Sequence, residues 1–183
     1  MKMKYLILLF FSFSFFACKE NNLVEVQLPE PEKKTITRFA NPEDVVAKEG
    51  IFEFPKLPYS YDEFENFING RTMELHYSKH FLNYTDKLNG LVNQNRALQD
   101  ISLEEILSLP KKDHADVLNN AGGYYNHKLF FELLTNKKTK ITTSLNEAII
   151  KDFGSFDNFK SEFITLSNKQ LGSSWVWLIM NTK

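Results

Sequence analysis

The sequence predicts a mainly α-helical protein that contains an antiparallel α-hairpin and has one apolar strand near its end. Two long segments, 69–92 and 111–134, read as helices, and the second carries apolar residues at i, i+4, i+7 spacing. A linker of about 20 residues joins them, which suits a helix that folds back along its neighbour. The unbroken apolar run 175–180 is typical of a buried strand.

Composition favours a folded domain and gives no indication of nucleic-acid binding. The chain has 183 residues, enough for one domain or two small ones, and 43% of them are hydrophobic. A formal net charge of -1 offers no general attraction to nucleic acid. The single cysteine, Cys18, excludes a disulfide bond within the chain.

The first 18 residues are typical of a lipoprotein signal peptide. Two lysines precede an apolar stretch over residues 5–16, and a small residue stands before Cys18. The stretch is short for a membrane span, which takes about 20 residues. Its ending resembles a bacterial lipobox, which implies cleavage that leaves Cys18 as a lipidated N-terminus. The protein would then be exported and lipid-anchored to the bacterial cell envelope, on its periplasmic or outer surface. The alternatives are an uncleaved anchor helix and a buried N-terminal helix.

Residues 19–50 are predicted to be a flexible tether. They are rich in charged residues and proline, and their apolar residues are too sparse to bury. The alternative for this stretch is a first strand of the domain.

The folded part begins near Phe52. Pro55 and Pro58 make its start extended and turn-like before the first long helix. Ser102 followed by Glu105 is a capping box, which predicts a short helix between the two long ones.

Two further helices are predicted, over 143–154 and 155–172. Ser144 and Glu147 form a capping box for the first helix, and Gly154 ends it. Ser155 begins the second helix and Gly172 ends it. The run 175–180 is then the single β element, and because a sheet takes at least two strands we expect the fold as written to be incomplete.

The histidines predict a metal site between the two long helices. His76, His80 and Tyr84 lie at i, i+4 and i+8, on one stripe of the first helix. Such imidazoles suit two metal ligands, or one ligand and its hydrogen-bonding partner. His127 follows two mid-helix glycines, which a helix retains where another group comes close. The alternative is that these are ordinary surface or core histidines, and His114 is given no role.

Five stretches resemble the iron/manganese superoxide dismutase family: LPYSYDEFENFING, TMELHYSKHFLNY, NNAGGYYNHKLFF, DFGSFDNFKSEF and LGSSWVWL. The resemblance implies an α-hairpin domain over 51–137 and an α/β (α+β) domain with a small antiparallel sheet over 138–183. It implies one iron or manganese ion per subunit between the two domains, usually within a homodimer. The implied reaction converts two superoxide ions and two protons to oxygen and hydrogen peroxide.

The resemblance also implies roles for individual residues. It makes His76 and His127 metal ligands, and it makes His80 and Tyr84 a gateway pair that relays protons. Two tryptophans, Trp175 and Trp177, would form an aromatic wall beside the metal. Gly123 stands where manganese-type members carry glycine and many iron-type members carry glutamine, which favours manganese.

The chain departs from the family pattern in three places. Phe81 replaces a histidine found in many members, and Phe131 replaces a common tryptophan. In the family, two more strands and an Asp-x-x-x-His segment with the last two ligands follow the first strand, and here no histidine follows His127. We therefore expect a C-terminally truncated member that holds only the first strand of its sheet. Two readings stay open: a superoxide dismutase that protects the cell envelope, or an inactive remnant or non-catalytic, membrane-tethered helical binding module.

Overall fold

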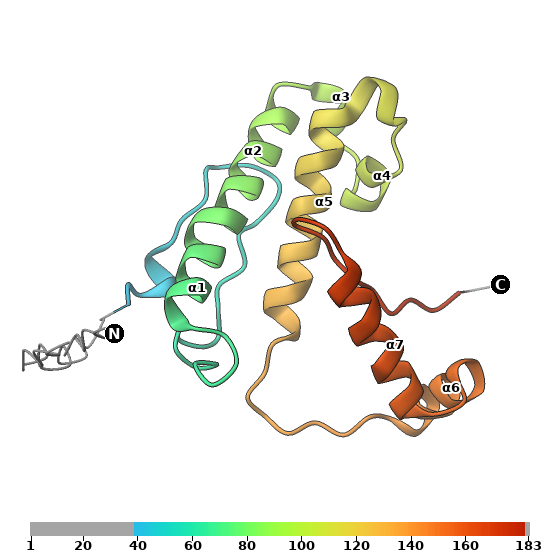
Figure 1. The fold of residues 1–183 in the computed structure, drawn as a ribbon. Coiled ribbons are helices and arrows are strands. Elements are labelled where there is room, and N and C mark those ends of the chain that lie inside the picture. Colours follow the sequence, from blue (N-terminus) through green and yellow to red (C-terminus); the bar gives the residue numbers. More distant parts are fainter. Residues whose placement is uncertain (1–38, 182–183) are drawn as a thin grey trace, which may run out of the picture. The chain divides into compact units, whose positions relative to one another are not determined.

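The computed structural model describes residues 39–181, and Figure 1 shows that this part is mainly helical. The signal peptide, Cys18 and the first part of the expected tether lie outside the described residues. After a short 3-10 helix at Pro42–Asp44, two helical arms form the hairpin. The first arm consists of α1 (Gly70–Leu75), a π-helix (His76–Phe81) and α2 (Leu82–Asn93). The second arm is α5 (Lys111–Leu133), which packs along α2.

Two short helices connect the arms, α3 (Arg96–Gln99) and α4 (Leu103–Leu107). The predicted capping box is confirmed at α4, because Ser102 accepts from the Glu105 backbone while the Glu105 carboxylate accepts from the Ser102 N–H. Two backbone donors at the start of this helix, the N–H groups of Ser102 and Glu105, are thereby satisfied. The connection turns the chain so that α5 returns alongside the first arm, and the predicted hairpin is present (Figure 1).

The core of the hairpin is buried and combines aromatic and aliphatic side chains. Side chains from both arms, from the connecting helices α3 and α4 and from the stretch before α1 meet in one cluster of buried residues: Leu57, Tyr61, Phe64, Met73, Tyr77, Phe81, Leu88, Val92, Leu98, Ile106, Val117, Ala121, Tyr124 and Phe131. Two phenol groups reach the backbone of the preceding stretch, since Tyr77 donates to the Pro55 carbonyl and Tyr124 to that of Glu53. Tyr77 and Tyr124 thus bury their apolar rings and still satisfy their hydroxyls.

Residues 39–50, the last part of the segment expected to be a tether, contact the first arm. The buried side chain of Asn89 accepts from the Phe52 N–H and donates to the carbonyls of Lys48 and Phe52. The Lys48 N–H donates to the Asp86 carboxylate at 2.7 Å. A Cβ at Gly50 would collide with the Asn89 side chain, so glycine permits this close approach.

The second pair of helices is α6 (Thr143–Phe153) and α7 (Phe156–Lys169), which pack against each other. Gly154 has a φ of 81° and ends α6, and Ser155 caps α7, as expected. The cap of α6 was predicted wrongly: Thr142, not Ser144, accepts from the backbone, at the Leu145 N–H. The helix also ends before Gly172, at Lys169.

The expected strand at 175–180 is not formed. Residues 170–181 have no regular secondary structure, and no strand is present anywhere in residues 39–181. A strand exists only when a second extended segment pairs with its backbone, and the described chain offers none. The α/β part of the fold prediction therefore has no support here, whereas the mainly helical part is confirmed. No helix within 39–181 is long and apolar enough to cross a membrane.

Candidate metal centre

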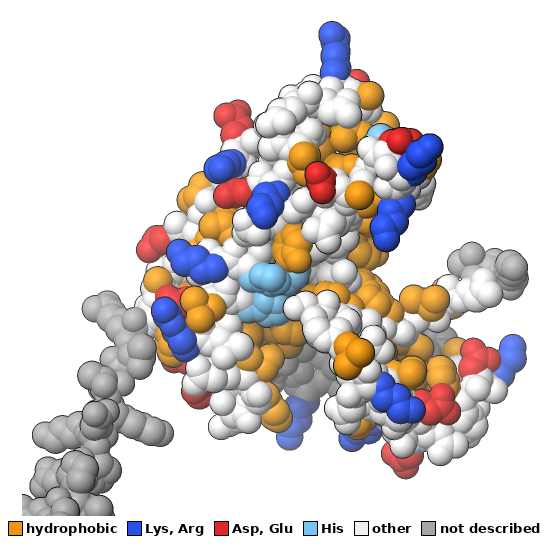
Figure 2. All heavy atoms as spheres, turned by 45° about the horizontal axis from the view of Figure 1, so that its top comes forward, with side chains coloured by type: hydrophobic (Ala, Val, Ile, Leu, Met, Phe, Trp, Pro, Cys, Tyr) orange, Lys and Arg blue, Asp and Glu red, His pale blue; other side chains and the backbone are white. Residues whose placement is uncertain are grey.

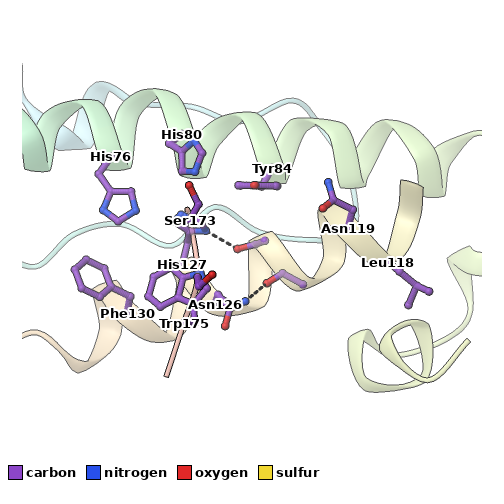
Figure 3. Close-up of a pocket in the computed structure, with 13 residues that line it drawn as sticks. His76, His80, Tyr84, Leu118, Asn119, Asn126, His127, Phe130, Ser173 and Trp175 are labelled. Carbon is purple, nitrogen blue, oxygen red and sulfur yellow. Dashed lines mark hydrogen bonds between the residues drawn. The ribbon is translucent and has the colours of Figure 1, made fainter. Parts of the chain in front are cut away.

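A pocket of about 600 Å³ opens between the arms of the hairpin, and segment 171–181 supplies one of its walls (Figure 3). Four of the predicted site residues from the hairpin meet there, together with one of the two tryptophans. The full lining is His76, His80, Tyr84, Leu118, Asn119, Gly122, Gly123, Asn126, His127, Phe130, Ser173, Ser174 and Trp175. Figure 2 shows histidine side chains gathered on one face of the molecule, beside hydrophobic side chains.

The π-helix positions His76 and His80 at this pocket. Both belong to the six residues His76–Phe81, which interrupt the regular helix between α1 and α2. Their ring centres lie 5.8 Å apart, and His80 continues to Tyr84 with a centre separation of 5.1 Å. The predicted stripe of three polar rings is therefore present. Single-turn π-helices occur often at functional sites, but the sequence reading assumed a uniform 3.6-residue period and missed this one.

His127 faces both histidines from the opposite arm. Its ring centre lies 4.9 Å from that of His76 and 4.9 Å from that of His80, and the residue is only 3% exposed. The Nδ1 atom donates to the Gly123 carbonyl at 2.6 Å, because a carbonyl oxygen can only accept. This bond fixes the tautomer and leaves Nε2 as the nitrogen available to a metal ion.

Burial keeps the two facing rings neutral. Desolvation, with smaller contributions from His127 and His80, lowers the pKa of His76 to about 4. Desolvation also lowers the pKa of His127, although the hydrogen bond to Gly123 opposes it. At neutral pH both residues are therefore neutral imidazoles, which is the form that binds metal.

Gly123 is glycine because Tyr84 occupies the space beside it. A Cβ at this position would lie inside the Tyr84 ring, whereas a Cβ at Gly122 would meet nothing within 4 Å. The Tyr84 ring also stacks on His127, with a centre separation of 5.2 Å and an interplanar angle of 30°. The expectation that something comes close to the mid-helix glycines is thus confirmed at Gly123 and not at Gly122.

The two tryptophans lie in different places. Trp175 lines the pocket, edge-on to His127 at 5.3 Å and to Phe130 at 5.7 Å between ring centres. Trp177 does not line the pocket; it stacks on Tyr125, at 5.7 Å and 18°. Phe130 extends the wall to His76, at 5.3 Å. Neither Phe130 nor Tyr125 was singled out from the sequence, since both read as ordinary helix residues.

Asn126 is a further polar residue that the sequence reading gave no role. It lines the pocket and donates from Nδ2 to the Gly122 carbonyl at 2.9 Å. Its Oδ1 atom is buried and has no hydrogen-bond partner among the described residues. An unpaired buried acceptor is costly, so this atom marks the pocket as a place where a water or another donor belongs.

The donors fit part of a metal centre. Two neutral imidazoles with centres 4.9 Å apart and planes at 80° can each direct one nitrogen at a shared ion. Within residues 39–181, no set of three or more His, Cys, Asp or Glu side chains is arranged to hold a metal. His76 and His127 could supply two ligand positions, and the described residues do not complete a set of three.

Comparison with known proteins identifies the family. The model of the iron/manganese superoxide dismutase alpha-hairpin domain matches residues 51–135, and that of the C-terminal domain matches residues 141–183. The chain belongs to the iron/manganese superoxide dismutase family. It is therefore an oxidoreductase by family, and the resemblance drawn from the sequence is confirmed at that level.

A curated relative supports the same assignment. "Superoxide dismutase [Mn]" of Listeria innocua serovar 6a is 40% identical to this chain over 135 residues. The aligned region covers 71% of this chain and 67% of the relative. The printed name assigns manganese to that protein.

Proposed function

We propose that this protein dismutates superoxide at one manganese or iron ion bound by His76 and His127. The observation that carries the proposal is the convergence of these two neutral rings across the hairpin, with centres 4.9 Å apart. A dismutase needs a metal that exchanges one electron, and imidazole suits iron as a ligand. Bound by His76 and His127, such an ion would supply one-electron chemistry between its +2 and +3 states, so that one superoxide is oxidised and the next is reduced.

The residues around the ion would orient its ligand His127, deliver protons and exclude water. The Gly123 carbonyl accepts from His127 Nδ1 and leaves Nε2 for the ion. His80 is exposed and sits beside the half-buried Tyr84, so the pair joins solvent to the pocket. We propose that His80 and Tyr84 carry protons inward to the peroxide product, while Trp175 and Phe130 exclude bulk water from the side of His127.

Manganese is the proposed metal. The Tyr84 ring fills the space beside Gly123, so a glutamine, the residue of many iron-type members, would require that ring to move. The curated relative from Listeria innocua is named as a manganese enzyme. Both observations favour manganese over iron. We propose one ion per subunit and a homodimer as the assembly.

The proposed location is the bacterial cell envelope. The support is the order of basic residues, a short apolar stretch and Cys18 in the first 18 residues, which lie outside the described structure. Lipid-modified protein should incorporate labelled palmitate and fractionate with membranes, and Cys18→Ser should abolish both. A Cys18→Ser protein that still carries label would contradict the anchor.

The activity is tested on the purified full chain after loading with Mn²⁺ or with Fe²⁺. We expect bound metal near one equivalent, superoxide decay that exceeds that of free metal, and at least a tenfold loss of bound metal in His76→Ala and in His127→Ala. His114→Ala is the matched control, since His114 lies on α5 and does not line this pocket. A folded chain that binds no metal and tolerates both substitutions would instead support a non-catalytic helical binding module.

A further inference from the structure

Segment 171–181 contacts α5 through the rings of Trp175 and Trp177. Trp175 meets His127 and Phe130, and Trp177 meets Tyr125. Among the described residues, no hydrogen bond joins residues 173–180 to the hairpin, and the one hydrogen bond of Ser174 is local, to Leu171. The apolar residues on either side are largely solvent-exposed, with Leu171 at 90% and Ile179 at 78%. The position of Trp175 therefore depends on few contacts.

We propose that Tyr125 is a positioning residue that holds Trp175 against His127 by stacking on Trp177. The inference rests on the proposed function in one respect, namely that Trp175 excludes water from a catalytic site beside His127. Tyr125 has no ring contact with Trp175, so its effect on that residue must pass through the backbone of residues 175–177.

The geometry of α5 explains how Trp175 and Trp177 can both contact this helix. Side chains advance by about 100° per residue around a helix, so Tyr125 and Phe130 lie about 140° apart, with Asn126 between them. Residues 175 and 177 of an extended chain point to the same side. The segment can therefore place one ring on each flank of this helix face, Trp177 over Tyr125 and Trp175 over Phe130.

The stack itself has the form expected of a stabilising pair. The Tyr125 and Trp177 rings are nearly parallel, at 18°, with centres 5.7 Å apart. Both side chains are more than one third exposed, with Trp177 at 38%, so neither is fixed in place by burial. Loss of one such aromatic pair should shift the ratio of docked to undocked segment about fivefold.

The two tryptophans make the segment directly visible. They are the only tryptophans in the chain, and fluorescence excited at the indole band therefore reports this segment alone. A Trp177→Phe background keeps a ring for Tyr125 to stack on and leaves Trp175 as the single emitter. In that background, Tyr125→Ser should shift Trp175 emission to the red and raise its quenching by iodide at least twofold. Tyr125→Phe should leave both unchanged, because the ring is retained.

A matched control separates positioning from general loss of structure. Leu133→Ser removes another exposed side chain from α5, at 69% exposure, that does not line the pocket, and it should leave Trp175 emission unchanged. Helical circular dichroism should be the same in all four proteins. Unchanged emission and iodide quenching in Tyr125→Ser would overturn the proposal, as would an equal change in Tyr125→Phe.

Quenching by Mn²⁺ tests whether Tyr125 affects the distance between Trp175 and the metal site. It also distinguishes failure of the proposed function from failure of the role of Tyr125. Added Mn²⁺ should quench Trp175 in the Trp177→Phe protein, since the ion would lie beside His127, and should quench it at least twofold less after Tyr125→Ser at equal bound metal. Equal quenching at equal bound metal would contradict the positioning role. If no metal binds, the proposed function fails, while the emission and iodide results still decide the role of Tyr125.

Discussion

The hairpin and the α6–α7 pair bury their apolar side chains to very different extents. In the hairpin, large rings and aliphatic side chains from both arms, their connection and the stretch before α1 meet in one buried cluster. In the α6–α7 pair only Ile149 is buried, and α7 buries no residue. Large apolar side chains are exposed along the pair and the segment after it: Leu145, Ile150, Phe156, Ile164, Leu166, Leu171, Trp177, Leu178, Ile179 and Met180.

The difference shows that α6 and α7 are regular helices although their apolar faces are largely exposed. Both members of the pair carry side-chain caps, at Thr142 and at Ser155, and Gly154 makes the turn between them. Caps and helix propensity act within a few residues and are satisfied without distant contacts. Burial of the apolar faces depends on other chain segments, and within 39–181 the pair has mainly its own aromatic contacts among Phe153, Phe159 and Phe163.

The largest expected effect is the removal of a ring from the hairpin core. Phe81 is fully buried and has ring contacts with Phe54, Tyr124 and Phe131. Phe81→Ala should lower the free energy of unfolding by about 3–5 kcal/mol, because a large cavity remains. Phe156→Ala, on the exposed side of α7, should cost no more than about 1 kcal/mol. Urea unfolding followed by circular dichroism measures both, and equal losses would contradict the comparison.

Amide hydrogen exchange should show the same division residue by residue. The central amides of α5, between Val117 and Phe131, pack on the closed core and should exchange only when the hairpin unfolds. Amides of α6 and α7 should exchange at least about tenfold faster, since few buried contacts hold these helices closed. Equal protection in the two regions would mean that the pair is covered in solution.

Two adjacent glycines give a smaller test with an internal control. Gly123→Ala forces a methyl group into the Tyr84 ring and should destabilise the hairpin by about 1–2 kcal/mol, after allowance for the better helix propensity of alanine. Gly122→Ala meets open space and should stabilise it by about 1 kcal/mol. Thermal unfolding of the two variants should move the midpoint in opposite directions. A Gly123→Ala protein as stable as Gly122→Ala would remove the steric argument for manganese.

The sequence predicts the features that depend on neighbouring residues, and it does not predict those that depend on contacts between distant segments. The two hairpin arms, the Ser102 capping box and the approach of a group to Gly123 follow from patterns a few residues long, and all are present. The fate of 175–180 depends on a pairing partner that no local pattern specifies. The π-helix at His76–Phe81 was missed for a related reason, since it shifts the register of one turn without a residue signature of its own.

The site shows the same limit. The meeting of His76, His80, Tyr84 and His127 could be predicted because helical spacing and a hairpin together bring these side chains to one place. The different positions of Trp175 and Trp177 could not, because they depend on which rings α5 presents to segment 171–181. Local periodicity predicts which residues share a face, whereas contacts between segments decide which of them reach the pocket.

The smallest expected effect concerns the start of α6, where two cap residues compete. Thr142 accepts from the Leu145 N–H at 3.4 Å, although Ser144 with Glu147 gives the stronger capping-box pattern. Thr142→Ala should lower the free energy of opening α6 by about 1 kcal/mol, as measured by amide exchange of its first turn. Ser144→Ala should change it by no more than a few tenths of a kcal/mol, because Ser144 is already inside the helix and caps nothing there. The opposite order would mean that α6 begins two residues later in solution. The capping box of Ser144 and Glu147, rather than the Thr142 cap, would then set the start of this helix.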